Sequence, residues 1–356
     1  MTFHRTLTAV ALTAAVLATA VLAAGCGTPT QDGTLTVYSP SGLGAWYEKQ
    51  FAEFTKQTGV RVTLFEAGSG EVVSRVNSPA TWKRFDTEKP VPPADVLVSL
   101  PPFIQKAAKA GLLVPGGADT AGITSPVLDP AGVYVPIAHT ALCFIVNPAA
   151  NPRPVTWNDL LRPDLKGKLQ YSTPGEAGDG TALLLLLQKQ MGKQQALDYL
   201  ARLQSNNVGP SSSTGTLQAK VDSGELLVAN GDVQMNLAGI KNDGYRFGIF
   251  FPAMPDGSRT TISLSYVAGV TANTERPDDA KKLLAFLLSD EAQRALATEA
   301  FGIPARDAIA TEVEDTADPL TPAGALKGVT LSTPDWNAAS DELESDVADY
   351  KKAIGG

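Results

Sequence analysis

The stretch LTVYSPSGLGAWYEKQFAEFTKQTGVRVTLF, residues 35–65, decides the fold class of this chain. Its first four residues alternate as in a strand, and its aromatic residues recur at the spacing of a helix that ends at Gly59. Residues 60–65 form the next expected strand, residues 71–76 the next helix, and residues 94–98 a third strand. Strands that alternate with helices build a parallel sheet, so we predict an α/β protein.

A second αβ block is expected over residues 148–252. Extended chain at 133–147 leads into it, and Thr156 is the expected cap of a helix over 154–161. Strands are expected at 165–171 and 247–252, and a helix at 181–191. A strand over 263–270 and amphipathic helices over 277–288 and 291–298 are expected to return to the first block. The pattern therefore predicts two lobes, which suits a mature length of about 330 residues.

The N-terminal segment has the features of a secretory signal peptide. Arg5 precedes an uncharged apolar run over residues 7–24, and small residues stand before Cys26. We predict that residues 1–25 are removed, that Cys26 is the acylated first residue of a lipoprotein, and that residues 26–33 form a tether. Ala23 stands where Leu is commoner in such a motif. A signal peptide without lipidation and a retained membrane anchor are the alternatives, and each places the working domain outside the cytoplasm.

The charge and the residue inventory disfavour several classes of function. Removing residues 1–25, whose one charged side chain is Arg5, changes the formal charge from −8 to −9, which does not suit a nucleic acid or an anionic lipid surface. The mature chain keeps one histidine, His139, and one cysteine besides Cys26, the expectedly buried Cys143. Such a chain is poor in zinc ligands, forms no expected disulfide, and contains neither a Gly-x-Ser-x-Gly elbow nor a phosphate loop. Hydrolysis by paired carboxylates stays open, and no cofactor is expected.

Segments spread over the mature chain resemble the solute-binding proteins of ABC importers. The segments that carry the resemblance are residues 35–39, 94–98, 156–160, 165–168, 276–280 and 286–289. The resemblance implies a periplasmic-binding-protein fold of type II: two αβ lobes with mixed sheets, joined by hinge strands, with a ligand cleft between them. Lobe 1 would comprise residues 34–140 with 262–356, and lobe 2 residues 141–261. It also implies a monomer that delivers its ligand to ABC permease subunits.

Within that family the chain is most similar to the 2-aminoethylphosphonate-binding branch, a neighbour of the ferric-iron binders. Residues 38–42, 46–47, 66–71, 99–103 and 213–215 carry this likeness. Ferric binders of this kind have two adjacent tyrosines as metal ligands. Ser265 and Tyr266 stand at the corresponding place here, and the chain has no Tyr-Tyr pair. Iron is therefore disfavoured, although separate tyrosines could still converge in space.

Three turns rich in serine and glycine precede expected helices, at residues 39–42, 69–70 and 178–181. Helix N-termini present free N–H groups and a partial positive charge, so they hold oxyanions without Lys or Arg. Each turn alone could be an ordinary cap. We predict an oxyanion site that includes Ser39, Ser41, Gly42, Leu43, Ser69, Gly70, Ser99, Thr140, Gly180, Thr181 and Ser213. His139, near the hinge, is either a further donor or a structural histidine.

A ligand with an ammonium group would also need a carboxylate. Glu71, Asp179 and Asp232 are the candidates, and for the first two the alternative is a partner of the helix dipole. Trp46, Tyr47 and Tyr266 could pack on the carbon chain or face the ammonium, with core packing as the alternative. We predict a lipid-anchored receptor for 2-aminoethylphosphonate that works by hinge closure. Other phosphonates, phosphate and ferric iron are alternative ligands; an extracytoplasmic phosphoester hydrolase and a sensor lipoprotein are alternative classes.

Overall fold

The computed structural model describes residues 33–78 and 92–355. The predicted signal peptide, Cys26 and most of the tether lie outside this range. The described residues from Thr34 onward form one compact unit. Among the residues described, no helix has the length and apolar character needed to cross a membrane.

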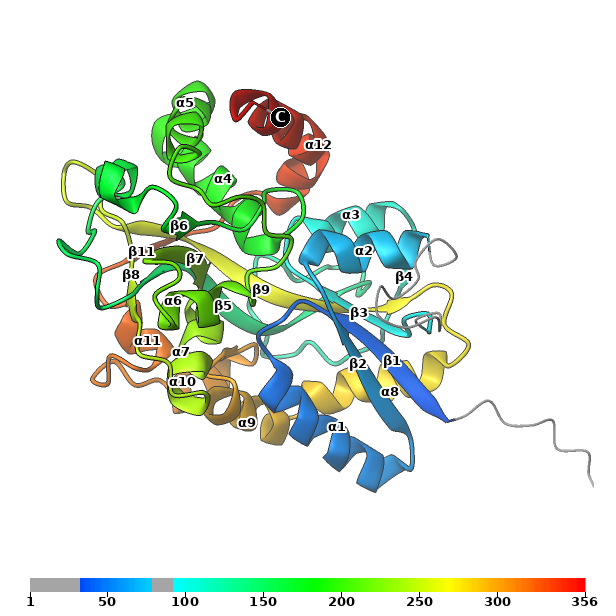
Figure 1. Cartoon of the computed structure of the whole chain (residues 1–356). Helices are drawn as coiled ribbons and strands as arrows, with labels where there is room; N and C mark the ends of the chain where they lie inside the picture. The colour runs from blue at the N-terminus through cyan, green and yellow to red at the C-terminus, as the bar shows by residue number, and fades with distance from the viewer. Residues whose placement is uncertain (1–32, 79–91, 356) are drawn as a thin grey trace, which may run out of the picture. The chain divides into compact units, whose positions relative to one another are not determined.

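The first block has the predicted alternation of strands and helices (Figure 1). Strand β1 (Thr34–Ser39) pairs in parallel with β2 (Arg61–Glu66) and with β3 (Val96–Ser99). The connecting helices are α1 (Gly44–Thr58) and α2 (Ser69–Asn77), and α3 (Phe103–Lys109) follows β3. Helix α1 ends at Gly59, as predicted, because that residue adopts the left-handed conformation (φ 76°) that glycine tolerates.

Two long strands continue the sheet. Strands β5 (Val135–Val146) and β9 (Thr260–Thr271) pair antiparallel to each other, and β9 also pairs antiparallel to β3. The far end of β5 pairs with β7 (Val228–Asp232) and β8 (Gly248–Phe250), and β6 (Leu169–Gln170) pairs with β7. The strand order is β2-β1-β3-β9-β5-β7-β6. The sheet is therefore mixed, as predicted.

The second block differs from the prediction at its short elements. Its main helices are α4 (Gly178–Met191), α5 (Lys193–Leu203), α6 (Leu217–Asp222) and α7 (Val233–Asn242). The strand predicted over 165–171 is wrong over its first part, because η3 (Pro163–Leu165) is a 3-10 helix. Where a helix was predicted over 154–161, the structure has only the 3-10 turn η2 (Asn158–Leu161). The Thr156 hydroxyl, just before this turn, accepts from the Asp159 N–H at 3.2 Å.

The C-terminal part adds elements that the sequence analysis did not predict. Helices α8 (Pro277–Leu287) and α9 (Asp290–Glu299) were expected, and they pack on the first block beside α1. The unpredicted elements are β4 (Leu113–Val114), β10 (Ile303–Pro304), α10 (Asp307–Glu312), α11 (Pro322–Ala325), β11 (Thr330–Ser332) and α12 (Trp336–Ala353).

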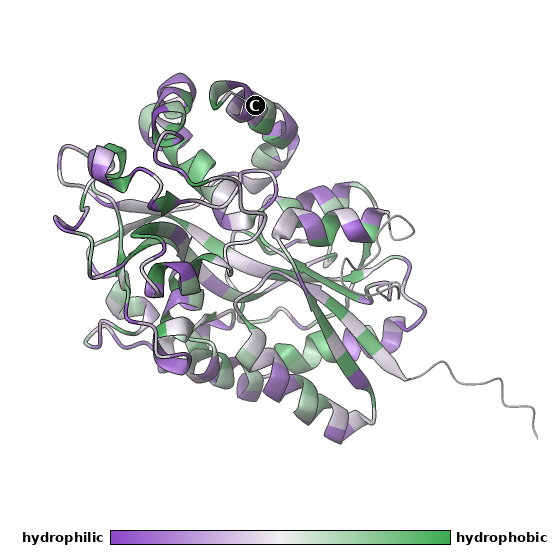
Figure 2. Ribbon diagram, in the orientation of Figure 1, coloured by the Kyte–Doolittle hydropathy of each residue, from purple (hydrophilic) through white to green (hydrophobic). Residues whose placement is uncertain are grey.

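Alternation along the strands supplies two hydrophobic layers. In β1, Leu35 and Val37 pack with α1 and α8, whereas Tyr38 packs with α2 and α3 on the opposite face. The layer that contains Tyr38 continues without a break beneath α4 and α5. Figure 2 shows the matching pattern on the helices, whose ribbons change between hydrophilic and hydrophobic colours from residue to residue.

Helix α12 contacts both αβ blocks. Lys106 and Lys109 of α3 pair with Glu344 and Asp341 at 2.6 Å each, and on the other side Lys193 at the start of α5 pairs with Asp346 at 2.9 Å. Figure 1 shows α12 beside α3 and α5. The division into lobes at residues 140 and 262 stays a prediction, and α12 would connect the two lobes across it.

A buried pair of tyrosines attaches α12 to the second block. The Tyr171 hydroxyl donates to Gln204 Oε1 at 2.9 Å, so at 3.1 Å it accepts from the Tyr350 hydroxyl. We expect Tyr350→Phe to lower the free energy of unfolding by about 1 kcal/mol, because it removes one buried hydrogen bond. Urea unfolding checks this. Tyr245→Phe, which removes a hydroxyl with no hydrogen bond in the described structure, should change stability by less than about 0.5 kcal/mol; equal losses in both variants would contradict the assignment.

A small polar cavity between two helix N-termini

A small, partly open cavity lies where the two αβ blocks meet. Its volume is about 20 Å³. Its walls are formed by Pro40, Ser41, Ala67, Gly68, Ser69, Leu100, Ala177, Gly178, Asp179, Ser213, Thr214, Gly215, Met235 and Tyr266. Larger hollows lie over α1 with β2 and beside α10 with α11, but none of their described lining residues carries a buried polar atom without a partner. The small cavity is therefore the candidate site.

Two helices begin at this cavity. Ser69 is the first residue of α2, and Gly178 and Asp179 are the first two residues of α4. Their N-cap residues, Gly68 and Ala177, make no side-chain capping hydrogen bond. The sequence analysis placed these residues in turns before the helices; this was wrong by about one turn, because both N-cap residues are extended and the helices start directly after them. Uncapped first turns leave N–H donors for a ligand.

Two buried polar atoms of the wall have no hydrogen-bond partner in the described structure: Ser69 Oγ and Asp179 Oδ1. Ser69 is 1% exposed and Asp179 is 3% exposed. Leaving a buried polar group without a partner costs about 1–3 kcal/mol, and more when it is charged. One atom is a hydroxyl that can donate and the other a carboxylate oxygen that accepts. Their placement on one cavity suits a ligand with complementary groups at two ends.

A second carboxylate, Asp232, stands behind Tyr266 and is fully hydrogen-bonded. It caps α7 by accepting from the Met235 N–H at 2.8 Å, and it accepts from Thr140 Oγ1 at 3.0 Å and from the Tyr266 hydroxyl at 3.2 Å. Burial raises the pKa of Asp232, and these hydrogen bonds oppose the rise. Burial also raises the pKa of Asp179, and the neighbouring charge of Asp232 raises it further.

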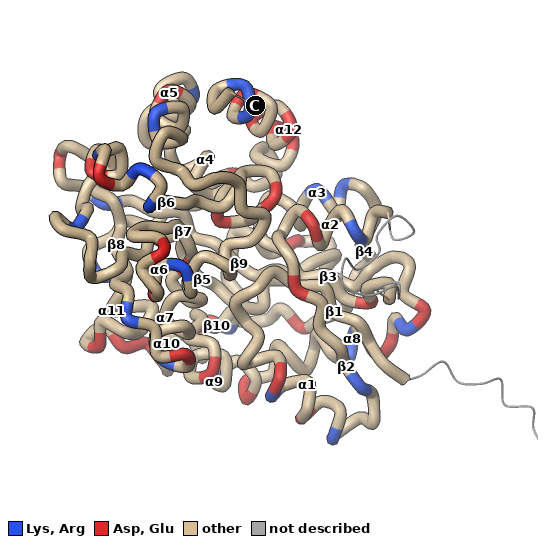
Figure 3. The backbone as a smooth tube through the Cα atoms, in the orientation of Figure 1, with Lys and Arg blue, Asp and Glu red and all other residues tan. Residues whose placement is uncertain are grey.

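Of the described residues that line the cavity, none is Lys or Arg. In Figure 3 the charged residues lie mostly on outer helices and loops, and most of the tube around the central strands carries neither charge. An anionic group in the cavity would therefore be held by N–H and hydroxyl donors alone. A cationic group would meet Asp179, with Asp232 close behind.

The two walls approach each other through glycines. A Cβ atom on Gly68 would lie 2.1 Å from the Ser212 carbonyl oxygen, and one on Gly178 would lie 2.4 Å from Leu100 Cδ1. Neither distance leaves room for a side chain. We call this line of contact between the two walls the glycine seam. The Gly70 N–H donates across it to the Glu176 carbonyl at 2.8 Å. The absence of Cβ atoms thus permits direct contact between residues near 68–70 and residues near 176–212.

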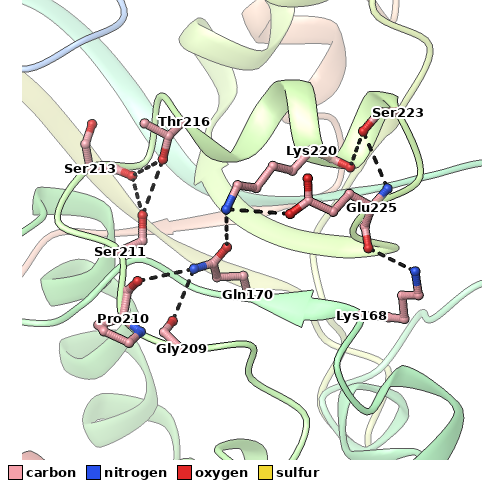
Figure 4. Close-up of polar contacts among 10 residues, drawn as sticks. All are labelled: Lys168, Gln170, Gly209, Pro210, Ser211, Ser213, Thr216, Lys220, Ser223 and Glu225. Atoms are coloured by element: carbon pink, nitrogen blue, oxygen red, sulfur yellow. Dashed lines mark hydrogen bonds and ion pairs between the residues drawn. The ribbon is translucent and has the colours of Figure 1, made fainter.

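The loop that carries Ser213, Thr214 and Gly215 is held in place by its own polar groups (Figure 4). Ser211 Oγ donates to the Ser213 carbonyl at 2.7 Å, and Thr216 Oγ1 donates to the same oxygen at 3.2 Å. Gln170 of β6 donates to the carbonyls of Gly209 and Pro210 at 3.2 and 3.3 Å. The cavity wall is therefore fixed to the sheet without help from a ligand.

Comparison with protein families gives the class of the molecule. A family model described as "Bacterial extracellular solute-binding protein" matches residues 35–302. The chain belongs to this family. It is thus a binding protein rather than an enzyme, as predicted.

Individual proteins agree with the family. A protein of Salmonella typhimurium named "Putative 2-aminoethylphosphonate-binding periplasmic protein" is 40% identical over 90% of this chain and 92% of its own length. The "Fe(3+)-binding periplasmic protein" of Serratia marcescens is 25% identical over 69% of this chain and 71% of its own. The periplasmic binding protein AfuA of Actinobacillus pleuropneumoniae, solved with fructose-6-phosphate, superposes with a TM-score of 0.75 at 22% identity, covering 90% of this chain and 99% of AfuA. This last likeness confirms the periplasmic-binding-protein fold.

Several residues predicted for the site of this solute-binding protein come together. Five of them line the cavity: Ser41, Ser69, Asp179, Ser213 and Tyr266. Three more lie directly behind its wall. Ser99 Oγ donates to the Ser69 carbonyl at 3.1 Å, Thr140 binds Asp232, and the Gly42 carbonyl accepts from Gln234 at 2.7 Å.

Other predicted residues have partners elsewhere. Glu71 accepts from Arg75 at 2.9 and 3.0 Å within α2, so its carboxylate is already paired. His139 Nδ1 lies 2.7 Å from Ser265 Oγ in the β5–β9 ladder, and burial lowers its pKa to about 4. Ser39 Oγ donates to the Pro40 carbonyl at 2.9 Å, and Thr181 Oγ1 donates to the Ala177 carbonyl at 2.9 Å.

The remaining predicted residues have packing roles. A Cβ on Gly180 would lie 2.0 Å from the Ser172 carbonyl, so this glycine lets α4 approach the chain after β6. Leu43 is the buried N-cap of α1, and Gly70 donates across the seam. Trp46 and Tyr47 lie in the hydrophobic layer between β1 and α1.

The sequence analysis did not single out Gly68, Leu100, Thr214, Gly215 and Met235 as wall residues. Gly215 and Thr214 adjoin the predicted Ser213, and Met235 is the residue that Asp232 caps, so their neighbours held a signal. Nothing in the sequence pattern indicates that Leu100 faces Gly178 across the seam.

The groups around Tyr266 give no indication of a ferric site. In the metal-free protein, burial and the charges of Asp232 and Asp179 raise the pKa of Tyr266 well above its usual value, so this tyrosine is protonated. Its hydroxyl donates to the Ser41 carbonyl at 2.9 Å and to Asp232. Within the described ranges, no cluster of three or more His, Cys, Asp or Glu residues has metal-binding geometry.

Proposed function

We propose that this solute-binding protein captures 2-aminoethylphosphonate for an ABC importer. The observation that carries the proposal is the pair of unpartnered buried atoms, Ser69 Oγ and Asp179 Oδ1, on one cavity whose described walls contain no Lys or Arg. The phosphonate would accept from Ser69 and from first-turn N–H groups of α2 other than that of Gly70, which donates to Glu176, and the ammonium would donate to Asp179. The 40% identity to the Salmonella typhimurium protein supports the same ligand class.

Charge separates this ligand from inorganic phosphate. Phosphate brings no cation to Asp179, so it would add negative charge beside the buried pair Asp179 and Asp232 without a compensating positive group. A zwitterion brings one group of each sign. A phosphate receptor therefore has less support than an aminophosphonate receptor. A ferric-iron receptor also has less support, because Tyr266 is protonated in the metal-free protein and its hydroxyl is hydrogen-bonded to the Ser41 carbonyl.

Capture would involve closure of the two predicted lobes over the ligand. Ligand contacts from both walls favour the closed arrangement over the open one. Ser41 and Ser69 belong to the first block, and Asp179, Ser213 and Thr214 to the second. The glycine seam supports this mechanism because it permits the walls to meet.

Calorimetric titration with 2-aminoethylphosphonate, ethylphosphonate, phosphate and ferric citrate tests the proposed ligand. We expect one-to-one binding of the aminophosphonate and weaker binding of ethylphosphonate by about 100-fold, because the latter leaves Asp179 unpaired. Preferred binding of phosphate or iron would overturn the ligand while leaving the family intact.

Ser69→Ala tests the phosphonate contact. We expect a loss of affinity of about tenfold, the effect of one hydrogen bond to a charged group, with no loss of stability in the ligand-free protein because the hydroxyl has no partner there. Ser340→Ala is the matched control, since Ser340 Oγ is also buried and unpartnered but belongs to α12. Equal affinities of the Ser69→Ala variant and the wild type would remove Ser69 from the site.

We further propose that Cys26 carries the lipid that tethers the protein to the outer face of the membrane. The sequence around Cys26 supports this step. We expect the wild-type protein to sediment with membranes and Cys26→Ser to appear in the soluble fraction. Mass spectrometry of the N-terminal peptide provides the direct readout; an unmodified peptide that begins elsewhere would contradict lipidation.

A further inference from the structure

The cavity holds an asymmetric pair of carboxylates. Asp179 is 3% exposed and Asp232 is 1% exposed. Asp232 accepts hydrogen bonds from Thr140, Met235 and Tyr266, whereas Asp179 Oδ1 has no partner in the described structure. The same amount of burial is therefore compensated more fully at Asp232 than at Asp179.

Among the residues that the structure describes, the groups that face this pair supply no positive charge. Cys143 of β5 and Tyr266 of β9 are the titratable neighbours, and burial keeps both protonated and neutral by raising the pKa of each. Thr214 is the remaining polar neighbour of Asp179, and its hydroxyl favours the ionised form only partly. Two adjacent buried carboxylates without a cation hold one proton between them. The hydrogen bonds to Asp232 direct that proton to Asp179.

We propose that Asp179 is protonated in the ligand-free protein and releases its proton to solvent when the ammonium group of the ligand binds beside it. This inference rests on the proposed function. The O–H bond of the carboxyl group breaks, its electron pair stays on the oxygen, and the proton passes to water or buffer. The ammonium keeps its own protons and replaces the released one as the positive partner of the pair.

Ligand affinity then depends on pH through the pair. Binding requires removal of a proton in acid, so affinity falls as the pH is lowered, and it reaches a plateau above the raised pKa of the free pair. A phosphate ion has the opposite preference, because it binds better when Asp179 keeps its proton and can donate it. The pair thus selects for a cationic group most strongly above the raised pKa of the free pair.

Infrared difference spectroscopy tests the proton directly, because the C=O band of a protonated carboxyl differs from the bands of a carboxylate and of the ligand. At about pH 5.5, saturating 2-aminoethylphosphonate should remove the intensity of one protonated carboxyl, and calorimetry should show affinity at least about tenfold higher at about pH 8. The band loss should vanish in Asp179→Asn at saturating ligand. It should persist in Asp346→Asn, which alters a buried carboxylate of α12 that pairs with Lys193 of α5.

The outcomes separate the two proposals. Tight binding with no loss of the band and equal affinity at both pH values would overturn proton release while leaving the proposed function in place. Persistence of the band loss in Asp179→Asn would overturn the assignment to Asp179. No binding at either pH would overturn the proposed function and this inference together.

Discussion

Asp179→Asn is expected to weaken binding of 2-aminoethylphosphonate by about 100-fold or more, because removing one member of a buried charge pair costs about 2–5 kcal/mol. The substitution keeps the shape of the side chain and removes only its charge. Calorimetric titration measures the loss. Glu71→Gln is the comparison: Glu71 is also acidic and in a first helical turn, but it pairs with Arg75 outside the cavity wall. A large loss in Glu71→Gln and none in Asp179→Asn would exchange the roles assigned to the two residues.

The same variant should gain stability when no ligand is bound. The pKa of Asp179 is raised in the folded protein, so the folded state binds more protons than the unfolded state between the two pKa values, and stability falls as the pH rises through that range. Asp179→Asn removes this penalty. We expect a gain of about 1–2 kcal/mol at about pH 8 that shrinks in acid. Denaturant unfolding at two pH values checks it, and a loss of stability at about pH 8 would show that the carboxylate has a partner.

Gly68→Ala is expected to lower ligand affinity by about 100-fold or more. The added methyl group would prevent the two walls from meeting, so the closed state that binds the ligand could not form. The new Cβ would lie 2.1 Å from the Ser212 carbonyl and 2.9 Å from the Glu176 carbonyl, which are backbone atoms that cannot rotate away. The backbone angles of Gly68, φ −65° and ψ 153°, suit alanine, so the fold itself should persist.

Gly44→Ala provides the matched control for the methyl group added at Gly68. Gly44 is the first residue of α1, and a Cβ there would meet its nearest neighbour, Glu66 Oε1, at 3.9 Å. We expect affinity within about twofold of the wild type. Normal binding by Gly68→Ala, measured in the same titration, would contradict the proposal that the seam closes on the ligand.

Local pattern predicted the first block because each of its elements is decided by nearby residues. Alternation marks β1 and β2, and the aromatic spacing with Gly59 marks α1. Helix α12 also carries a readable pattern, since its buried Trp336, Leu343 and Tyr350 recur every seven residues. Its role could not be predicted, because its partners on α3 and α5 are distant in the sequence.

The candidate site was predictable only in part. Small residues before helices indicated the N-termini of α2 and α4, and they do line one cavity. Glu71 and Asp179 looked alike, although Arg75 four residues after Glu71 was a signal for an intrahelical pair that Asp179 lacks. Two other features of the site depend on contacts between segments that are distant in the sequence. Asp179 lies near Asp232, and Gly68 lies against Ser212. No local pattern in a single sequence indicates such contacts.

A crystal structure of the protein with 2-aminoethylphosphonate is the most direct test of the central claim. The account predicts the amine nitrogen within hydrogen-bond distance of Asp179 Oδ1 and a phosphonate oxygen at Ser69 Oγ and the first turn of α2. A ligand bound in the reverse orientation, or bound outside this cavity, would contradict it.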